Sequence, residues 1–325
     1  MITYRPATEE LHYTFAARPP VATVKPGDVV EVWTQDCFGG LVRTEQDLPS
    51  QVCDLSKVNP VSGPFHVQGA EPGDTLALHF LSIVPSNDWG VSSTFPHFGA
   101  LTSTHETATL QPPLEERVWR YEIKENEVIY AGNGVQWRLP MDPMHGTVGL
   151  APGGGQAITS LTSGPHGGNL DTPEIRAGVT LYLGVNVEGA LFGLGDGHAR
   201  QGEGEACGVG VECAMTTTVA VELIKGVATP WPRIETDEAL MSIGAVRPLE
   251  DAYRISHVDM TRWVQELTGF GELDAYQFLS QAGTARIGNV CDPAYTVLAR
   301  LDKRLLPGGA PTVYGGVHAR MRAQR

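Results

Sequence analysis

The sequence lacks long apolar runs, a leader-like N-terminus and an excess of positive charge. No run approaches the roughly 20 apolar residues that a membrane-spanning helix requires, and no signal-like apolar segment follows Met1. Lys and Arg number 23 against 37 Asp and Glu, which gives a formal net charge of −14. That charge repels phosphate backbones and anionic lipids. We therefore expect no nucleic-acid partner, no membrane partner and a cytoplasmic location.

Cysteine is also scarce, and several familiar catalytic signatures are absent. The five cysteines form no Cys-x-x-Cys pair, which is typical of reduced, mostly buried thiols in a cytosolic protein. Cys207 and Cys213 have no His at motif spacing, which argues against a cysteine nucleophile. No Gly-x-Ser-x-Gly or His-Glu-x-x-His occurs, and the Gly-rich stretch 149–156 lacks the Lys-Ser/Thr of a phosphate-binding loop.

Glycine and proline are abundant, at 38 and 23 residues, which favours many tight turns and short strands. The stretches 24–37 and 70–84 each contain a Pro-Gly-Asp turn followed by alternating apolar residues, the pattern of a turn that starts a strand. Residues 176–196 repeat this pattern less strictly. We predict a mainly β fold, with a β-sandwich or barrel-like core of repeated strand units over residues 1–230.

The middle of the chain is less regular. Residues 115–130 predict a hairpin, whereas the aromatic-rich stretch 87–101 predicts a loop. Residues 141–172 are so rich in Gly and Pro that they predict a linker or the loop wall of a functional site. His145, and the His and Asp residues further along this stretch, favour the functional wall.

Residues 231–325 predict a smaller α+β segment that packs on the core as part of one structural unit. Helical spacing of apolar residues predicts helices over 250–267 and 272–281. An extended strand is expected over 236–244, a short helix or strand over 293–306, and a basic tail that frays or docks. His257 and Asp259 are expected on a solvated helix face.

The strongest functional signal is GDGHARQGEGE, residues 195–205, which directly follows an apolar run. If that run is a strand that continues into the motif, Asp196 and His198 share one face because strand side chains alternate. A carboxylate and an imidazole so placed can bind one divalent cation. Glu205 or Glu203 would then supply a further ligand or a general base, and both are candidate catalytic residues.

A second cluster, GPHGGNLD, lies at residues 164–171. His166 and Asp171 flank a Gly-Gly pair that permits a sharp turn, and they would complete a set of three or four metal ligands. The candidate metal ligands are therefore His166, Asp171, Asp196 and His198. The candidate substrate-binding residues are Asn169, Gly167, Gly168, Asp36 and His97.

Each of these candidates also has a plain structural alternative. Asp196, Glu203 and Glu205 also suit turn carboxylates of an acidic surface loop, and His166 a solvated loop histidine. Asn169 also suits a left-handed turn, Asp36 a turn cap after a strand, and His97 a packed position in an aromatic loop. His66, His79 and His105 have no partner at motif spacing and are expected to be structural.

Four motifs in order resemble the acetamidase/formamidase family, over roughly residues 20–300. GDGHARQGEGE resembles its GDxHAxQGxGE signature, and SGPHGGNLD (163–171) its G-x-x-G-G-N-x-D segment. The stretch NPVSGPFHVQGAEPGD (59–74) resembles its strand entry, and MDPMHGTVGLAP (141–152) its Pro-Met loop. The resemblance implies a β-rich fold, hydrolysis of a short aliphatic amide, a homo-oligomer and a divalent metal. The site residues that it singles out are His166, Asp171, Asp196, His198 and Glu205.

Some residues depart from the family pattern. Arg200 stands where smaller residues are familiar, His145 occupies an aliphatic or small position in the Pro-Met loop, and the stretches 65–66 and 96–98 are unusual. These departures leave the identity of the amide open.

We therefore expect a small neutral amide as substrate, with Glu205 or Glu203 taking a proton from a water activated by metal. Two histidines favour Zn²⁺ over Ca²⁺. A related hydrolase of a larger or ureido-type amide, and a non-catalytic protein with a structural Ca²⁺, remain alternatives.

Overall fold

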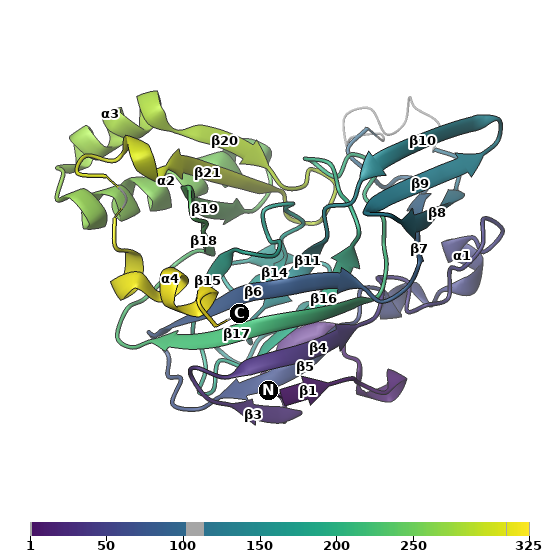
Figure 1. The fold of residues 1–325 in the computed structure, drawn as a ribbon, viewed down its shortest axis with the longest axis horizontal. Coiled ribbons are helices and arrows are strands. Elements are labelled where there is room, and N and C mark those ends of the chain that lie inside the picture. The colour runs from purple at the N-terminus through teal and green to yellow at the C-terminus, as the bar shows by residue number, and fades with distance from the viewer. Residues whose placement is uncertain (1, 102–113, 310, 325) are drawn as a thin grey trace.

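The computed structural model describes residues 2–101, 114–309 and 311–324, so that His105 lies outside the described residues. Strands dominate the described chain and the long helices lie in its C-terminal part, which confirms the mainly β prediction. Figure 1 shows helices α2 and α3 at one end of the molecule and a small sheet, β7 to β10, at the other. None of the described helices has the length and apolar character needed to cross a membrane.

The largest sheet contains the strands predicted from the turn pattern. In the described chain it has nine strands in the order β1-β4-β17-β6-β15-β18-β19-β21-β20. In that order their bounds are Ile2–Tyr4, Val29–Thr34, Met215–Ile224, Thr75–Pro85, Thr180–Gly184, Arg233–Glu235, Ala239–Ala245, Thr296–Asp302 and Thr284–Ile287. β4, β6 and β15 are the three strands that follow the repeated turns. The sheet runs on past residue 230, so the N-terminal and C-terminal segments share it.

A six-stranded sheet packs against the large one, because β4 contacts both β5 and β16. Its order is β13-β14-β11-β16-β5-β3. The bounds are Ser163–Gly164, Gly167–Asn169, Met144–Gly149, Phe192–His198, Val61–Val67 and Ala22–Val24. Buried side chains of both sheets form one core that includes Val32, Leu78, Val219, Phe65, Val148 and Phe192.

The prediction of a linker or loop over residues 141–172 was wrong, because this stretch holds β11, β13 and β14, and also β12 (Ala157–Thr159), which pairs with β2 (Thr14–Ala16). The glycines allow strands to approach closely here. A Cβ on Gly149 would lie 2.7 Å from the backbone nitrogen of Gly168. The high glycine content of residues 141–172 therefore reflects close packing of strands, whereas in the sequence alone it suggested a flexible segment.

A four-stranded sheet, β10-β9-β8-β7, completes the β structure (Figure 1). Its strands are Val135–Pro140, Glu127–Gly132, Arg117–Lys124 and Trp89–Thr94. The hairpin expected over 115–130 is confirmed as β8 and β9. The loop expected over 87–101 was wrong in its first half, because β7 pairs with β8 and Val91 also bridges to Glu212.

The C-terminal segment packs its helices on the large sheet. α2 (Leu249–Thr268) and α3 (Glu272–Ala282) confirm the two predicted helices, and residues 296–302 form strand β21. The tail docks through α4 (Val317–Arg322), whose Val317 and Met321 join a core with Ala77 and Tyr182. The remaining helices are short: α1 (Pro49–Val52) and the 3₁₀ turns Thr8–Glu10, Leu55–Lys57, Lys303–Leu305 and Val313–Gly316.

The expectation of a solvated face for Asp259 was wrong. Asp259 and Arg233 are each only 2% exposed, and two hydrogen bonds of 2.8 and 2.9 Å join the guanidinium to the carboxylate. Ser242 donates a further hydrogen bond to the same carboxylate. This ion pair fixes α2 to strands β18 and β19.

We expect Asp259→Ala to lower the free energy of unfolding by about 3–5 kcal/mol, because the buried guanidinium of Arg233 loses its counter-charge. The midpoint of urea unfolding measures the change. Asp251→Ala serves as the control on the same helix, since Asp251 pairs with Arg254 at the surface. Equal midpoints for the two variants would contradict a stabilising role for the buried pair.

Candidate functional site

A cavity of about 340 Å³ has an apolar wall and an acidic floor. The apolar side chains of its wall include Phe38, Leu55, Val58, Phe95, Phe98, Leu161 and Val209. Its carboxylates, which we call the acidic floor, are Asp171, Asp196, Glu205, Glu212 and Asp292. All five are buried. Apolar walls around a few convergent polar groups are typical of a site for a small ligand.

The pairing of β11 with β16 positions the first part of the acidic floor. His145 pairs with Gly197 and Thr147 with Gly195, which places Asp196 beside Gly146. A Cβ on Gly146 would lie 2.2 Å from Asp171 Oδ1 and 2.3 Å from Asp196 Oδ2. A glycine at this position is therefore required for the two carboxylates to converge.

His198 lies among the carboxylates with its ring held by Gln201. The Gln201 amide nitrogen donates to the carbonyls of Asp171, at 2.7 Å, and Gly288, at 3.2 Å, so its oxygen is left to accept from His198 Nδ1–H at 2.9 Å. This assignment of the proton leaves His198 Nε2 facing Glu212 Oε1 at 3.1 Å and Asp196 Oδ1 at 3.4 Å. The lone pair of His198 Nε2 repels two negatively charged carboxylates. This arrangement is therefore favourable only if a proton or a cation lies between the nitrogen and the carboxylate oxygens.

Asp171 and Asp292 form the second part of the acidic floor. A hydrogen bond joins their carboxyl groups. Asn169 donates to Asp292 Oδ2 at 2.9 Å, and its own oxygen accepts from Asn59 at 2.8 Å. Burial raises the pKa of Asp292 to about 6, and burial with the charges of Glu205 and Asp292 raises the pKa of Asp171 well above its ordinary value.

Glu205 and Glu212 complete the acidic floor. Cys291 Sγ donates to Glu205 Oε2 at 3.4 Å, and burial together with the charge of Asp292 raises the pKa of Glu205 well above its ordinary value. Burial raises the pKa of Glu212 to about 7. Glu205 and Glu212 therefore each hold a proton more readily than in water, because other carboxylates are close and solvent is excluded.

His198 and Asp196 differ from these carboxylates, because the pKa shift of each favours its charged form. Burial alone would lower the pKa of His198, but the charges of Glu212 and Asp196 outweigh it and raise that pKa well above its ordinary value. Burial likewise opposes the charge on Asp196, yet His198 lowers the pKa of Asp196. His198 and Asp196 therefore each favour the charged form beside the other.

The donor set of the floor fits a divalent cation. Ligand atoms of Asp171, His198 and Glu205 all lie within 4.8 Å of one another. Two further groups meet the same criterion: one is Cys37 with Asp196 and Glu212, the other Glu205 with Cys291 and Asp292. Asp171 Oδ1 and Glu212 Oε2 are buried and have no hydrogen-bond partner among the described residues. Orphaned acceptors that converge on one space are well matched to a cation.

Three predicted site residues lie elsewhere. The Glu203 carboxylate is exposed and pairs with Arg286. His97 is exposed and does not line the cavity, although its neighbours Pro96 and Phe98 do. Asp36 caps a turn, because its Oδ1 accepts from the backbone N–H groups of residues 38 and 40 at 2.9 and 3.0 Å.

His166, Gly167 and Gly168 support the acidic floor without lining the cavity. The ring of His166 lies edge-on against Phe15, with centroids 5.6 Å apart, and burial lowers its pKa to about 4. His166 belongs to none of the close ligand groups of the described residues. Gly167 and Gly168 lie within β14, where a Cβ on either would lie 2.3 Å from a backbone carbonyl oxygen.

Two of the residues that depart from the family pattern, His145 and Arg200, have structural partners. His145 is fully buried behind the floor, bonded to the carbonyl of Gly195 at 2.7 Å and the hydroxyl of Thr217 at 2.6 Å. Arg200 donates to the carbonyl of Pro140 at 2.6 Å and does not line the cavity.

Sequence reasoning missed Glu212, Asp292, Cys37 and Cys291. Glu212 lies seven positions beyond the GDGHARQGEGE motif, among apolar residues, and reaches the floor by bridging to Val91 and His198. Asp292 comes from the C-terminal segment, where only the short Cys-Asp-Pro sequence precedes β21. Neither carboxylate has a local partner in sequence that could have marked it.

The chain was compared with known families and relatives. The model of the Acetamidase/Formamidase family matches residues 8–160 and 154–292. A formamidase from Methylophilus methylotrophus is 28% identical, over 64% of this chain and 62% of that protein. An acetamidase from Mycolicibacterium smegmatis is also 28% identical, over 64% of each chain. The chain thus spans less than two thirds of the length of these curated relatives.

Solved structures give a closer match. The crystal structure of an acetamidase from Yersinia enterocolitica has a TM-score of 0.87 and 44% identity, and the match covers 92% of this chain and 90% of that one. An acetamidase from Bacillus halodurans has a TM-score of 0.83 and 33% identity, over 93% and 96% of the two chains. A gamma lactamase from Delftia acidovorans, at 20% identity and a TM-score of 0.62 over 95% and 94%, shares the fold alone.

We expect Zn²⁺ or Ca²⁺ to raise the melting temperature of the metal-stripped protein, because a cation relieves the repulsion in the acidic floor. A cation at 100 times its Kd stabilises the folded state by about 2.7 kcal/mol. Gly146→Ala should abolish the shift, since its Cβ takes the space of two carboxylates. Gly202→Ala is the control, because its Cβ would contact nothing within 4 Å. A full shift in Gly146→Ala would mean that the cation binds elsewhere.

Proposed function

The chain belongs to the acetamidase/formamidase family, and on that premise we propose that it hydrolyses a short linear amide to ammonia and a carboxylate. The observation that supports this proposal is the acidic floor beneath an apolar wall. A neutral amide with a short alkyl group fits such a wall, whereas an anionic substrate would be repelled by the floor.

Asp171, Asp196 and His198 are the proposed metal ligands. Carboxylate oxygens of Asp171 and Asp196 both face Gly146, and Asp196 Oδ1 lies 3.4 Å from His198 Nε2. Asp171 and His198 also belong to one close ligand group. A divalent cation there would lower the pKa of a bound water toward about 7 and polarise the amide carbonyl. We leave His166 out of the proposed set because its ring lies against Phe15. One imidazole with several carboxylates supports Zn²⁺ less strongly than two imidazoles would, and Ca²⁺ remains the alternative.

Glu205 is the proposed general base. It lines the cavity within the same close group as Asp171 and His198, whereas Glu203 is turned to Arg286 at the surface. Glu205 would take a proton from the attacking water and return it to the departing amide nitrogen, which leaves as ammonia.

Asn59 is proposed to orient the substrate. Its side chain lines the cavity, and its amide nitrogen is already used in hydrogen bonds to Thr147, Asn169 and the carbonyl of Ser160. Asn59 Oδ1 is buried and has no hydrogen-bond partner among the described residues. We propose that this oxygen accepts a hydrogen bond from the –NH₂ group of a primary amide.

We expect Glu205→Gln to lower kcat by at least about 100-fold while the bound metal content stays close to that of the wild type, because the amide cannot accept the proton. Ammonia release and metal analysis measure the two quantities. Glu203→Gln is the matched control and should retain activity within about twofold, since its carboxylate lies outside the cavity. Near-normal turnover by Glu205→Gln would show that another carboxylate, with Glu212 the first candidate, takes the proton.

We expect kcat/KM to rise from formamide through acetamide to propionamide, by roughly fourfold for each methylene that packs against the apolar wall. Urea has no apolar part and should be the poorest substrate. Ammonia release from each compound measures the series. A folded, metal-loaded protein that is inert on all four would contradict the short-amide assignment. It would favour a larger or ureido-type amide, or a structural Ca²⁺ site.

A further inference from the structure

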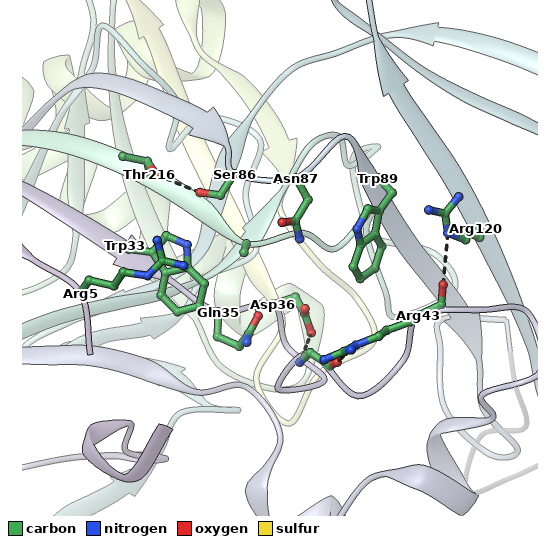
Figure 2. A pocket seen from close by; sticks show the side chains of 12 residues that line it. Arg5, Trp33, Gln35, Asp36, Arg43, Ser86, Asn87, Trp89, Arg120 and Thr216 are labelled. Atoms are coloured by element: carbon green, nitrogen blue, oxygen red, sulfur yellow. Dashed lines mark hydrogen bonds between the residues drawn. The ribbon is translucent and has the colours of Figure 1, made fainter. Parts of the chain in front are cut away.

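A second cavity, of about 590 Å³, lies where the large sheet meets the four-stranded sheet (Figure 2). Its lining comes from the residue after β1, from β4 and the turn that follows it, from the β6–β7 connection, and from β7, β8 and β17. It shares no lining residue with the cavity of the acidic floor. The proposed amide hydrolysis does not use it.

Three arginines give this cavity a positive charge in a chain whose net charge is −14. Arg5, Arg43 and Arg120 come from distant parts of the sequence and line the same space. Among the described residues, no side-chain nitrogen of the three lies within 4.0 Å of a carboxylate oxygen, although the Asp47 carboxylate accepts the backbone N–H of Arg43 at 3.0 Å. Convergent guanidinium groups without a directly paired carboxylate indicate affinity for an anion in an acidic protein.

The guanidinium groups are held in place by neutral partners. Arg5 lies over the ring of Trp33 at 4.6 Å, and Arg120 lies over the ring of Trp89 at 5.5 Å. Arg43 Nε donates to the carbonyl of Gly40 at 2.7 Å, and Arg120 Nε donates to the carbonyl of Arg43 at 3.1 Å. Stacking and Nε bonds fix the planes of these groups while the terminal nitrogens remain available to a ligand.

The one carboxylate among the described lining residues, Asp36, forms no direct ion pair with the arginines, although the charge of Arg43 acts on it. Asp36 is only 1% exposed, and its Oδ1 already accepts two backbone N–H groups. Burial raises the pKa of Asp36. The side chain therefore braces the turn that forms the base of the cavity.

The rest of the lining suits an organic group attached to the anion. Trp33 and Trp89 stand on opposite sides of the space in Figure 2, and Asn87 extends between them. One face of each indole is covered by an arginine, and Trp89 also packs against the small apolar cluster that includes Phe38 and Val118, so the cavity is lined by the remaining exposed parts of the two indoles. The amides of Gln35 and Asn87 supply hydrogen-bonding groups for polar atoms of a ring.

We propose that this cavity binds a small organic anion, a phosphate or carboxylate attached to a planar ring. The arginines Arg43 and Arg120 bind the oxygen atoms, and the ring packs against Trp89 or Trp33. A lone inorganic ion would use the charge of the cavity and leave its aromatic surface and most of its volume unused.

The test is isothermal titration calorimetry on the full chain. The probes are benzoate and adenosine monophosphate, with inorganic phosphate as the bare anion and benzyl alcohol and adenosine as the neutral counterparts. We expect at least one ring anion to bind one-to-one with a Kd below about 1 mM and the bare and neutral compounds to bind at least about tenfold more weakly. Whichever of benzoate and adenosine monophosphate binds more tightly identifies the combination of ring and anionic group that the cavity prefers.

Arg43→Gln and Arg120→Gln should each weaken that Kd about tenfold, because each removes a charge-assisted hydrogen bond. Arg304→Gln, which removes an equal charge from the C-terminal surface, should leave the Kd within about twofold. Both cavity arginines are exposed, so we expect the variants to fold, which melting temperature checks. A Kd above about 1 mM for both ring anions overturns the proposal. The proposal is also overturned if benzyl alcohol or adenosine binds as tightly as its anionic counterpart. It is likewise overturned if Arg304→Gln weakens binding as much as Arg43→Gln or Arg120→Gln does.

Discussion

The repulsion among five buried carboxylates is the constraint on which the site depends. Asp171, Asp196, Glu205, Glu212 and Asp292 are each less than 10% exposed, and His198 is the one imidazole in their close ligand groups within the described chain. Such a cluster is tolerated only if protons or a cation offset its charge. The raised pKa values of four of these carboxylates and of His198 are the signature of this constraint in the absence of a cation.

The fold accommodates this crowding through its backbone. Asp171, Asp196 and Glu205 all have positive φ, at 41°, 56° and 44°, a conformation that costs non-glycine residues roughly 1–3 kcal/mol each. Strain of this kind persists where surrounding structure holds it, and here β11, β14 and β16 do so. Asp292 reaches the floor from the C-terminal segment, so both parts of the chain must be in place to form the site.

The sequence predicted the part of the site that is local in the chain. GDGHARQGEGE indicated Asp196, His198 and Glu205, and SGPHGGNLD indicated Asp171, because alternation and tight glycine turns act over a few residues. The two motifs themselves meet through the pairing of β14 and β16 with β11. Glu212 and Asp292 could not be found in this way, since their partners are created by strand pairing and by a distant loop. Glycine composition was ambiguous for the same reason. A glycine-rich stretch can form a flexible loop or allow strands to approach closely. The atoms that surround Gly149 and Gly168 in the folded structure show that the second holds here.

The two cavities have opposite charge and are separated by one turn, residues 35–40. Gln35 and Asp36 face the arginine cavity, whereas Cys37 and Phe38 line the acidic one. Asp36 fixes this turn through its two backbone hydrogen bonds. In the proposed reaction a neutral amide enters the acidic cavity and a carboxylate must leave it, so the floor repels the product and not the substrate. An anion would therefore be disfavoured on one side of the turn and attracted on the other, which allows amide turnover and anion binding to proceed on the same chain without competing for one site.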